Sequence, residues 1–172
     1  MEKKANCIFL LGMPACGKTY WAKKLAGEFA VAMIDLDAII ETEQQMTITA
    51  NFENKGETYF RKLEHKTLKK IIQQTKVKTI ISLGGGTPCF FDTISLLNKV
   101  GITIYLQAKP STLLQNISQA PHQRPLLNDL DSALSKLSQL LKERKAIYEQ
   151  AAYIFEVETL QVDSFKPFFE KP

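Results

Sequence analysis

Residues 12–19 read Gly12-Met13-Pro14-Ala15-Cys16-Gly17-Lys18-Thr19. The apolar run Cys7–Leu11 precedes this stretch and a segment with helical spacing follows it, which is the strand-to-helix context of a phosphate-binding loop. Its two glycines allow successive backbone N–H groups to point at phosphate oxygens. Lys18 can bridge β- and γ-phosphates, and the Thr19 hydroxyl can ligate Mg²⁺. The stretch therefore predicts a site for a nucleoside triphosphate rather than an ordinary glycine-rich turn.

The composition is that of an ordinary globular chain. With 172 residues, 45% of them hydrophobic, it can bury one sizeable core, and we expect a single domain over residues 1–172. The net charge of +4 is not gathered in a dense basic tract, which favours a small anionic substrate and no nucleic-acid partner. No apolar run approaches the ~20 residues of a membrane span. We expect a monomer without a membrane partner.

The cysteines and histidines form no recognisable ligand set. Cys7, Cys16 and Cys89 are an odd number without zinc-site spacing, which fits a reducing compartment and predicts a cytoplasmic protein. His65 and His122 have no partnered motif, and we expect a helix-surface residue and a loop residue. Cys16 stands inside the phosphate loop, where positive charge would stabilise a thiolate. The sequence leaves open whether Cys16 is reactive or points into the core as a small hydrophobe.

Apolar runs of strand length alternate with segments of helical spacing. The runs are Cys7–Leu11, Val31–Ile34, Val77–Leu83, Ile102–Leu106 and Tyr153–Val157. Helices are expected at Lys18–Ala30, Glu57–Gln74, Thr93–Val100 (with Asp92 as N-cap and Gly101 just past its end), about Ser111–Ser118, Leu130–Tyr148 and about Asp163–Glu170. This alternation predicts an α/β fold, a parallel sheet with helices on both faces. Ligands bind at the carboxyl ends of such strands, where Gly12, Asp35 and Gly84 fall.

Two groups of residues with chemical significance follow the expected strands. Asp35 and Asp37 flank Leu36 at the end of the second run, and side-chain alternation along a strand would put both carboxylates on the side of the phosphate loop. One could hold the water shell of Mg²⁺ and the other could take the proton of an acceptor hydroxyl. The alternative is a solvated strand end with Asp37 as a helix cap. Gly84–Gly86 follow the next run and allow a ligand to approach the backbone closely.

Three arginines are candidates for binding an anionic substrate. Arg61 lies early in a helical segment, and Arg144 shares a helix face with Tyr148, one turn away. Spacing alone does not separate these two arginines from solvated surface charge. Arg124 lies in Gln119–Asp131, which is rich in Pro, Asn, Gln and Asp and predicts a mobile loop. An arginine in such a loop can close over a transferring phosphoryl group.

In their order and spacing these segments resemble the shikimate kinase family, within the nucleoside-monophosphate-kinase-like branch of P-loop proteins. The resemblance runs from about Ile8 to Tyr153 and rests on GMPACGKT, the two aspartates, GETYFR, the triple glycine, and RPLL followed by Glu143-Arg144 and Tyr148. It implies a five-stranded parallel sheet in the order 2-3-1-4-5 and a mobile lid at about residues 119–131. It also implies an ATP-dependent phosphotransferase that phosphorylates the 3-hydroxyl of shikimate, in chorismate and aromatic amino acid biosynthesis.

The resemblance implies a role for each matching residue. ATP would be bound by Gly12, Met13, Pro14, Ala15, Cys16, Gly17, Lys18, Thr19 and the lid residue Arg124. Mg²⁺ would be held by Thr19 and, through water, by Asp35. Shikimate would be bound by Asp37, Arg61, Gly84, Gly85, Gly86 and Arg144, of which the planar arginines suit its carboxylate. The catalytic residues would be Lys18, Asp37 and Arg124, with Asp37 as the base.

Three positions depart from the usual pattern of the family. Ala15 and Gln45 stand where glycine is common, and Leu113–Ile117 lacks the arginine that often stacks on adenine. Two rival functions stay open: another small-molecule kinase of the same fold, such as a gluconate kinase, and a non-catalytic ATP-binding module. The triple glycine and Arg61 favour shikimate over gluconate. An enzyme is favoured over a binding module because the sequence retains Lys18, Thr19, Asp35, Asp37 and Arg124.

Overall fold

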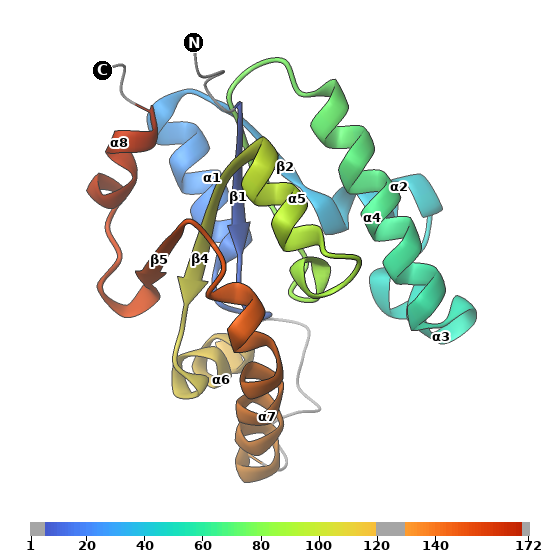
Figure 1. Cartoon of the computed structure of the whole chain (residues 1–172). Coiled ribbons are helices and arrows are strands. Elements are labelled where there is room, and N and C mark those ends of the chain that lie inside the picture. Colours follow the sequence, from blue (N-terminus) through green and yellow to red (C-terminus); the bar gives the residue numbers. More distant parts are fainter. Residues whose placement is uncertain (1–5, 120–129, 170–172) are drawn as a thin grey trace.

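The computed structural model describes residues 6–119 and 130–169. Its centre is a five-stranded parallel sheet in the order β2-β3-β1-β4-β5, which confirms the predicted order (Figure 1). The strands are β1 (Cys7–Leu11), β2 (Ala32–Asp35), β3 (Thr79–Ser82), β4 (Gly101–Gln107) and β5 (Tyr153–Glu156). Each lies within two residues of the predicted run at either end.

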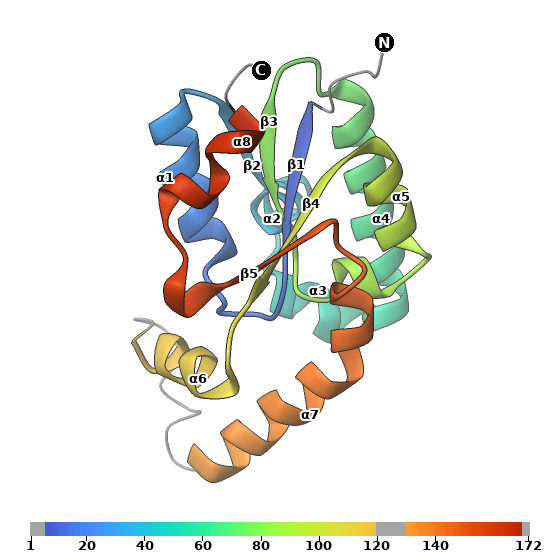
Figure 2. The same cartoon turned by 60° about the vertical axis from the view of Figure 1, so that its left-hand side comes forward.

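Helices cover both faces of the sheet, as predicted. They are α1 (Lys18–Phe29), α2 (Leu36–Gln44), α3 (Ile48–Lys55), α4 (Glu57–Gln74), α5 (Thr93–Val100), α6 (Pro110–Gln119), α7 (Leu130–Tyr148) and α8 (Lys166–Phe169), with short 3₁₀ turns η1 (Thr87–Cys89), η3 (Val157–Thr159) and η4 (Val162–Phe165). Figure 2 shows α1 and α8 on one face and α4 and α5 on the other. α6 and α7 lie beyond the carboxyl ends of the strands.

The middle strand explains where the phosphate loop lies. No residue of β1 is more than 4% exposed, because β1 has a neighbour at each edge and helices over both faces. A strand buried on both sides reads as a continuous apolar run instead of an alternating one, as Cys7–Leu11 does. The loop that follows β1 therefore starts at the centre of the carboxyl edge of the sheet.

The structure corrects the reasoning about the two aspartates. β2 ends at Asp35, and the helix α2 begins at Leu36, so Asp37 belongs to a helix and strand alternation does not place it. The cap of α2 is Asp35, whose Oδ1 accepts a hydrogen bond from the Ala38 amide at 3.2 Å. Neither α2 nor α3 was expected, because both are short and polar residues interrupt their apolar spacing.

Two other local predictions were wrong in part. Asp92 stands just before α5 as predicted, but its backbone is left-handed and its side chain accepts from Ser95 Oγ at 2.6 Å instead of capping the helix. The prediction for Gly101 is confirmed, because it stands just past the end of α5, where it also begins β4. The helix expected at about Asp163–Glu170 is split, within the described residues, into η4 and α8.

None of the described helices combines the length and the apolar character needed to cross a lipid bilayer.

Candidate active site

A cavity of about 1300 Å³ opens at the carboxyl ends of the strands. It is lined by the phosphate loop, the start of α2, the inner side of α4, the triple glycine, α6 and α7. The predicted site residues on its wall are Pro14, Ala15, Cys16, Gly17, Lys18, Thr19, Asp35, Asp37, Arg61, Gly84, Gly85, Gly86 and Arg144. Gly12 and Met13 lie buried beneath this wall. The fold thus brings together residues that are far apart in the sequence.

The phosphate loop is shaped by its two glycines. Gly12 has φ 142° and Gly17 has φ 93°, which other residues rarely adopt. A Cβ on Gly12 would also stand 2.6 Å from the Leu106 carbonyl oxygen of β4. Lys18 is 8% exposed, and its Nζ donates to the carbonyl oxygens of Gly12 at 3.0 Å and Met13 at 2.8 Å. The ammonium group is therefore held inside the loop, where phosphate oxygens would take over its hydrogen bonds.

Three oxygen-bearing side chains meet at the start of α1. Thr19 Oγ1 donates to Asp35 Oδ2 at 2.6 Å and lies 3.3 Å from Ser82 Oγ. Sequence reasoning missed Ser82. Its place at the end of the third apolar run could have indicated it, because ligands bind at the carboxyl ends of the strands. No group of three or more His, Cys, Asp or Glu residues that could hold a metal occurs in the described parts of the chain. The donor set fits Mg²⁺, which is commonly held by few protein oxygens together with substrate phosphates.

Asp37 lies in an electronegative environment. Its pKa is raised from 3.8 to about 6, mainly by burial, then by the nearby carboxylates Glu64, Asp35 and Glu41, whereas Lys18 opposes the rise. Asp37 is thus still ionised at neutral pH but is a stronger base than an ordinary carboxylate. A perturbed carboxylate in a cavity that also contains a phosphate loop is a candidate general base.

Arg61 is buried rather than solvated. Its guanidinium donates from Nη1 to Glu64 Oε2 at 2.9 Å and from Nε to Glu57 Oε1 at 3.3 Å. Three aromatic rings surround the group, with Arg61 Cζ 5.3 Å or less from the ring centroids of Phe52, Phe60 and Phe90. Glu64, which sequence reasoning missed, is 2% exposed and also accepts from Thr87 Oγ1 at 2.6 Å. These contacts fix the guanidinium before any ligand arrives.

Each glycine of the triple glycine faces a different part of the cavity wall. A Cβ on Gly84 would lie 2.8 Å from Glu64 Oε1 and 3.0 Å from Asp37 Oδ1. On Gly85 it would lie 2.7 Å from Pro14 Cδ in the phosphate loop, and on Gly86 it would lie 2.6 Å from Arg61 Cζ. At each glycine the shortest of these distances is below what a real Cβ makes, so close packing, and not only flexibility, favours the three glycines.

The last turns of α7 connect to the same loop. Tyr148 is fully buried, and its hydroxyl donates to the Gly85 carbonyl oxygen at 2.6 Å. Burial raises the pKa of Tyr148, and the nearby Arg144 opposes that rise. Arg144 itself lines the cavity. One helix therefore supplies both a cation to the cavity and a hydrogen bond that holds the triple glycine.

The remaining sequence predictions concern the lid, the two histidines and Cys16. Arg124, His122 and most of the predicted lid lie outside the described residues, so those predictions stay untested. Cys16 is fully buried, and burial raises its thiol pKa although Lys18 opposes the change, which favours the small-hydrophobe alternative over a reactive thiolate. His65 is a partly buried residue of α4, and it is not among the residues that line this cavity.

The two residues that stand where the family commonly has glycine have strained backbone conformations. Ala15 has φ 63° and Gln45, at the end of α2, has φ 51°. Both values lie in the left-handed region that favours glycine. At the position without the family's arginine, Asn116 Nδ2 donates to the Ala15 carbonyl oxygen at 2.7 Å and so joins α6 to the phosphate loop.

Comparison with known proteins agrees with this geometry. Residues 14–168 match the family described as shikimate kinase. The chain belongs to the shikimate kinase family. A shikimate kinase of Bacteroides fragilis is 38% identical over 156 residues, which cover 90% of this chain and 86% of the relative.

Solved structures of shikimate kinases also superpose on the fold. The Bacteroides thetaiotaomicron enzyme has a TM-score of 0.88 at 33% identity and covers 96% of this chain and 98% of its own. The Acinetobacter baumannii enzyme, solved in complex with shikimate, has a TM-score of 0.77 at 31% identity over 90% of this chain and 84% of its own. As a member of the shikimate kinase family, the chain is an ATP-dependent kinase that acts on an alcohol group.

Proposed function

We propose that the cavity transfers the γ-phosphoryl group of ATP to the 3-hydroxyl of shikimate, with Mg²⁺ as the metal. The observation that carries this proposal is that one cavity brings together a phosphate loop, a carboxylate with a pKa near 6 and two arginines. These are the groups needed to bind a triphosphate, to accept a hydroxyl proton and to bind a carboxylate. A non-catalytic ATP-binding module would need neither the second nor the third.

On the ATP side, the backbone N–H groups of the loop and Lys18 bind the phosphates. Thr19 and Ser82 would hold Mg²⁺ with their hydroxyl oxygens, and Asp35 would hold it through water. The metal would supply positive charge beside the phosphate oxygens. Arg124 is proposed to act from the lid as a second cation on the transferring group.

On the acceptor side, Asp37 hydrogen-bonds the reacting hydroxyl and takes its proton. Arg61 and Arg144 bind the carboxylate of the acceptor. Glu57 and Glu64 occupy Nε and Nη1 of Arg61, which leaves the Nη2 edge, next to Gly86, for the ligand. The glutamates thereby orient the guanidinium and prevent it from turning away from the cavity.

The direct test measures ADP release with shikimate, with gluconate and with no acceptor. We expect ADP release that depends on shikimate. Release that depends on gluconate instead would establish the rival kinase, and no acceptor-dependent release would favour the binding module.

Arg144→Ala tests the acceptor side more cleanly than Arg61→Ala, which would leave Glu64 buried without its counter-ion. Losing one charge-assisted contact costs roughly 1.5–3 kcal/mol, so the KM for shikimate should rise about 10- to 150-fold while the KM for ATP stays unchanged. The matched control is Lys145→Ala, because Lys145 is the next residue of α7 and forms an exposed pair with Glu149. An unchanged KM for shikimate in Arg144→Ala would remove Arg144 from the site.

We also propose that residues 1–172 act as one P-loop kinase domain, as a monomer in the cytoplasm and without nucleic-acid or membrane partners. All three cysteines are free thiols, which supports a reducing compartment. Light scattering on purified protein tests the monomer, with a mass near 19.4 kDa as the expected result.

A further inference from the structure

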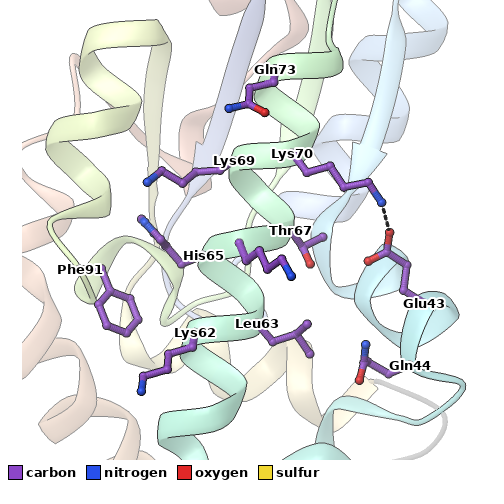
Figure 3. Close-up of a pocket in the computed structure, with 11 residues that line it drawn as sticks. Glu43, Gln44, Lys62, Leu63, His65, Thr67, Lys69, Lys70, Gln73 and Phe91 are labelled. Carbon is purple, nitrogen blue, oxygen red and sulfur yellow. Dashed lines mark hydrogen bonds and ion pairs between the residues drawn. The ribbon is translucent and has the colours of Figure 1, made fainter.

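A second groove, of about 830 Å³, lies on the outer side of α4. Figure 3 shows its lining, which comes from α4, from α2 and from the turn before α5. Among the described residues, none lines both this groove and the active-site cavity. The groove is therefore a separate feature that the kinase chemistry does not use.

The groove is strongly basic. Four lysines line it, Lys62, Lys66, Lys69 and Lys70, against one carboxylate, Glu43. Glu43 is already paired with Lys70 at 2.8 Å. The other three lysines form no ion pair within the described ranges. Like charges along one helix face repel each other, and a bound anion would relieve that repulsion.

One half of the groove also presents aromatic rings. Phe91 is 51% exposed, and its ring centroid lies 5.3 Å from that of His65. His65 is fixed by a 3.0 Å hydrogen bond between Nδ1 and Thr93 Oγ1. Phe91 and Asp92 both have left-handed φ values, near 50°, an uncommon conformation for large side chains, and this turn holds the Phe91 ring outward.

The charges and the rings lie together. Figure 3 shows Lys62, His65 and Lys69 extending from α4 toward the side of Phe91, whereas Lys70 extends to the opposite side, to Glu43. Lys62 and Lys69 are two helical turns apart, about 10 Å along the axis. The pKa of His65 is lowered by burial and by Lys69, so its ring is a neutral surface at physiological pH.

We propose that this half of the groove is a binding site for a flat aromatic anion. The ring stacks on Phe91 beside His65, and carboxylate or phosphate groups on the ring or its substituent pair with Lys62 and Lys69. Such a ligand would bridge α4 and the turn before α5. Arg61 lies on the other side of α4, where it donates to Glu64. Glu64 also accepts from Thr87 of η1, which shortly precedes the turn before α5. The groove therefore lies directly behind the proposed acceptor site.

The test uses ¹⁵N-labelled protein with its active site saturated by shikimate and MgADP. Phthalate, a flat arene dicarboxylate, and AMP, a base that carries a phosphate, are titrated separately, with inorganic phosphate as the anion without a ring. We expect saturable amide shifts at residues 62–69 and 91–93 with at least one of the two ring-bearing anions, and at least tenfold weaker binding of phosphate. The two ring-bearing probes distinguish an arene carboxylate from a nucleotide.

Variants decide which half of the groove binds. Phe91→Ala should weaken binding about fivefold and the double variant Lys62→Gln/Lys69→Gln about tenfold. Lys70→Gln removes a lysine from the same helix and should change affinity less than twofold. All four side chains are exposed, so these variants should fold. The proposal would be overturned if Lys70→Gln weakened binding as much as the other variants, if phosphate bound as tightly as the ring-bearing anions, or if no saturable shifts occurred in the groove. None of these results would bear on the proposed kinase activity.

Discussion

Gly86→Ala is the sharpest test of how the acceptor site is built. A Cβ at residue 86 would stand 2.6 Å from Arg61 Cζ and 2.7 Å from Nη1. Comfortable contact between heavy atoms begins at about 3.5 Å, so one group must move by about 1 Å. Arg61 cannot withdraw easily, because Glu64 holds it at 2.9 Å and aromatic rings surround it. The variant should therefore displace the guanidinium from its position in the cavity.

The expected loss is that of one charge-assisted hydrogen bond, roughly 1.5–3 kcal/mol, or about 10- to 150-fold in affinity for shikimate. Calorimetry measures shikimate binding. Trp21, the one tryptophan of the chain, lies against Gly17, so its fluorescence should report nucleotide binding. In Gly86→Ala the affinity for MgATP should change less than twofold.

Two alanine variants serve as controls. Gly27→Ala, on α1, has no heavy atom within 4 Å of the new Cβ and should bind both substrates normally. Gly85→Ala would press on Pro14 and should weaken nucleotide binding instead. Normal shikimate affinity in Gly86→Ala would refute the packing argument, and equal losses for both substrates would indicate general damage to the fold.

Three further predictions follow from individual side chains. Asp37→Asn should lower kcat ~10²–10⁴-fold. Folding raises the pKa of Asp37 from 3.8 to about 6. Ionisation of this carboxyl therefore costs up to about 3 kcal/mol of folding stability above pH 6 and nothing below pH 4. Asp37→Asn removes this cost, so it should raise the Tm at pH 7 but not at pH 4. For the wild type, kcat/KM should rise with pH up to about 6, and a flat profile between pH 5 and 7 would contradict the base assignment. Tyr148→Phe removes the bond to Gly85 and should raise the KM for shikimate about fivefold at unchanged KM for ATP, and an unchanged KM for both would show that the bond is dispensable. Gln45→Gly should increase the free energy of unfolding in urea by about 1 kcal/mol because it relieves a left-handed residue, and a loss of stability would show that the side chain matters more than the backbone.

Local pattern determined much of this fold. The phosphate loop, the five strands and the exact bounds of α4 and α7 follow from glycine positions and apolar spacing, which act through neighbours in the chain. The strand order came from the family resemblance instead, because spacing does not tell which strands pair. The short helices α2 and α3 were missed, and with them the correct placement of Asp37.

Only the tertiary structure decided the surroundings of the site residues. Glu64 belongs to the site because the fold brings it to Thr87, 23 positions away in the sequence. Ser82 belongs to it because the fold brings it to Thr19, 63 positions away. The direction of Cys16 and the burial of Arg61 depend in the same way on partners supplied by other elements. Residue identity specifies which chemistry is possible, whereas burial and neighbouring charge, which set the pKa of Asp37 and the orientation of Arg61, arise only when distant segments pack together.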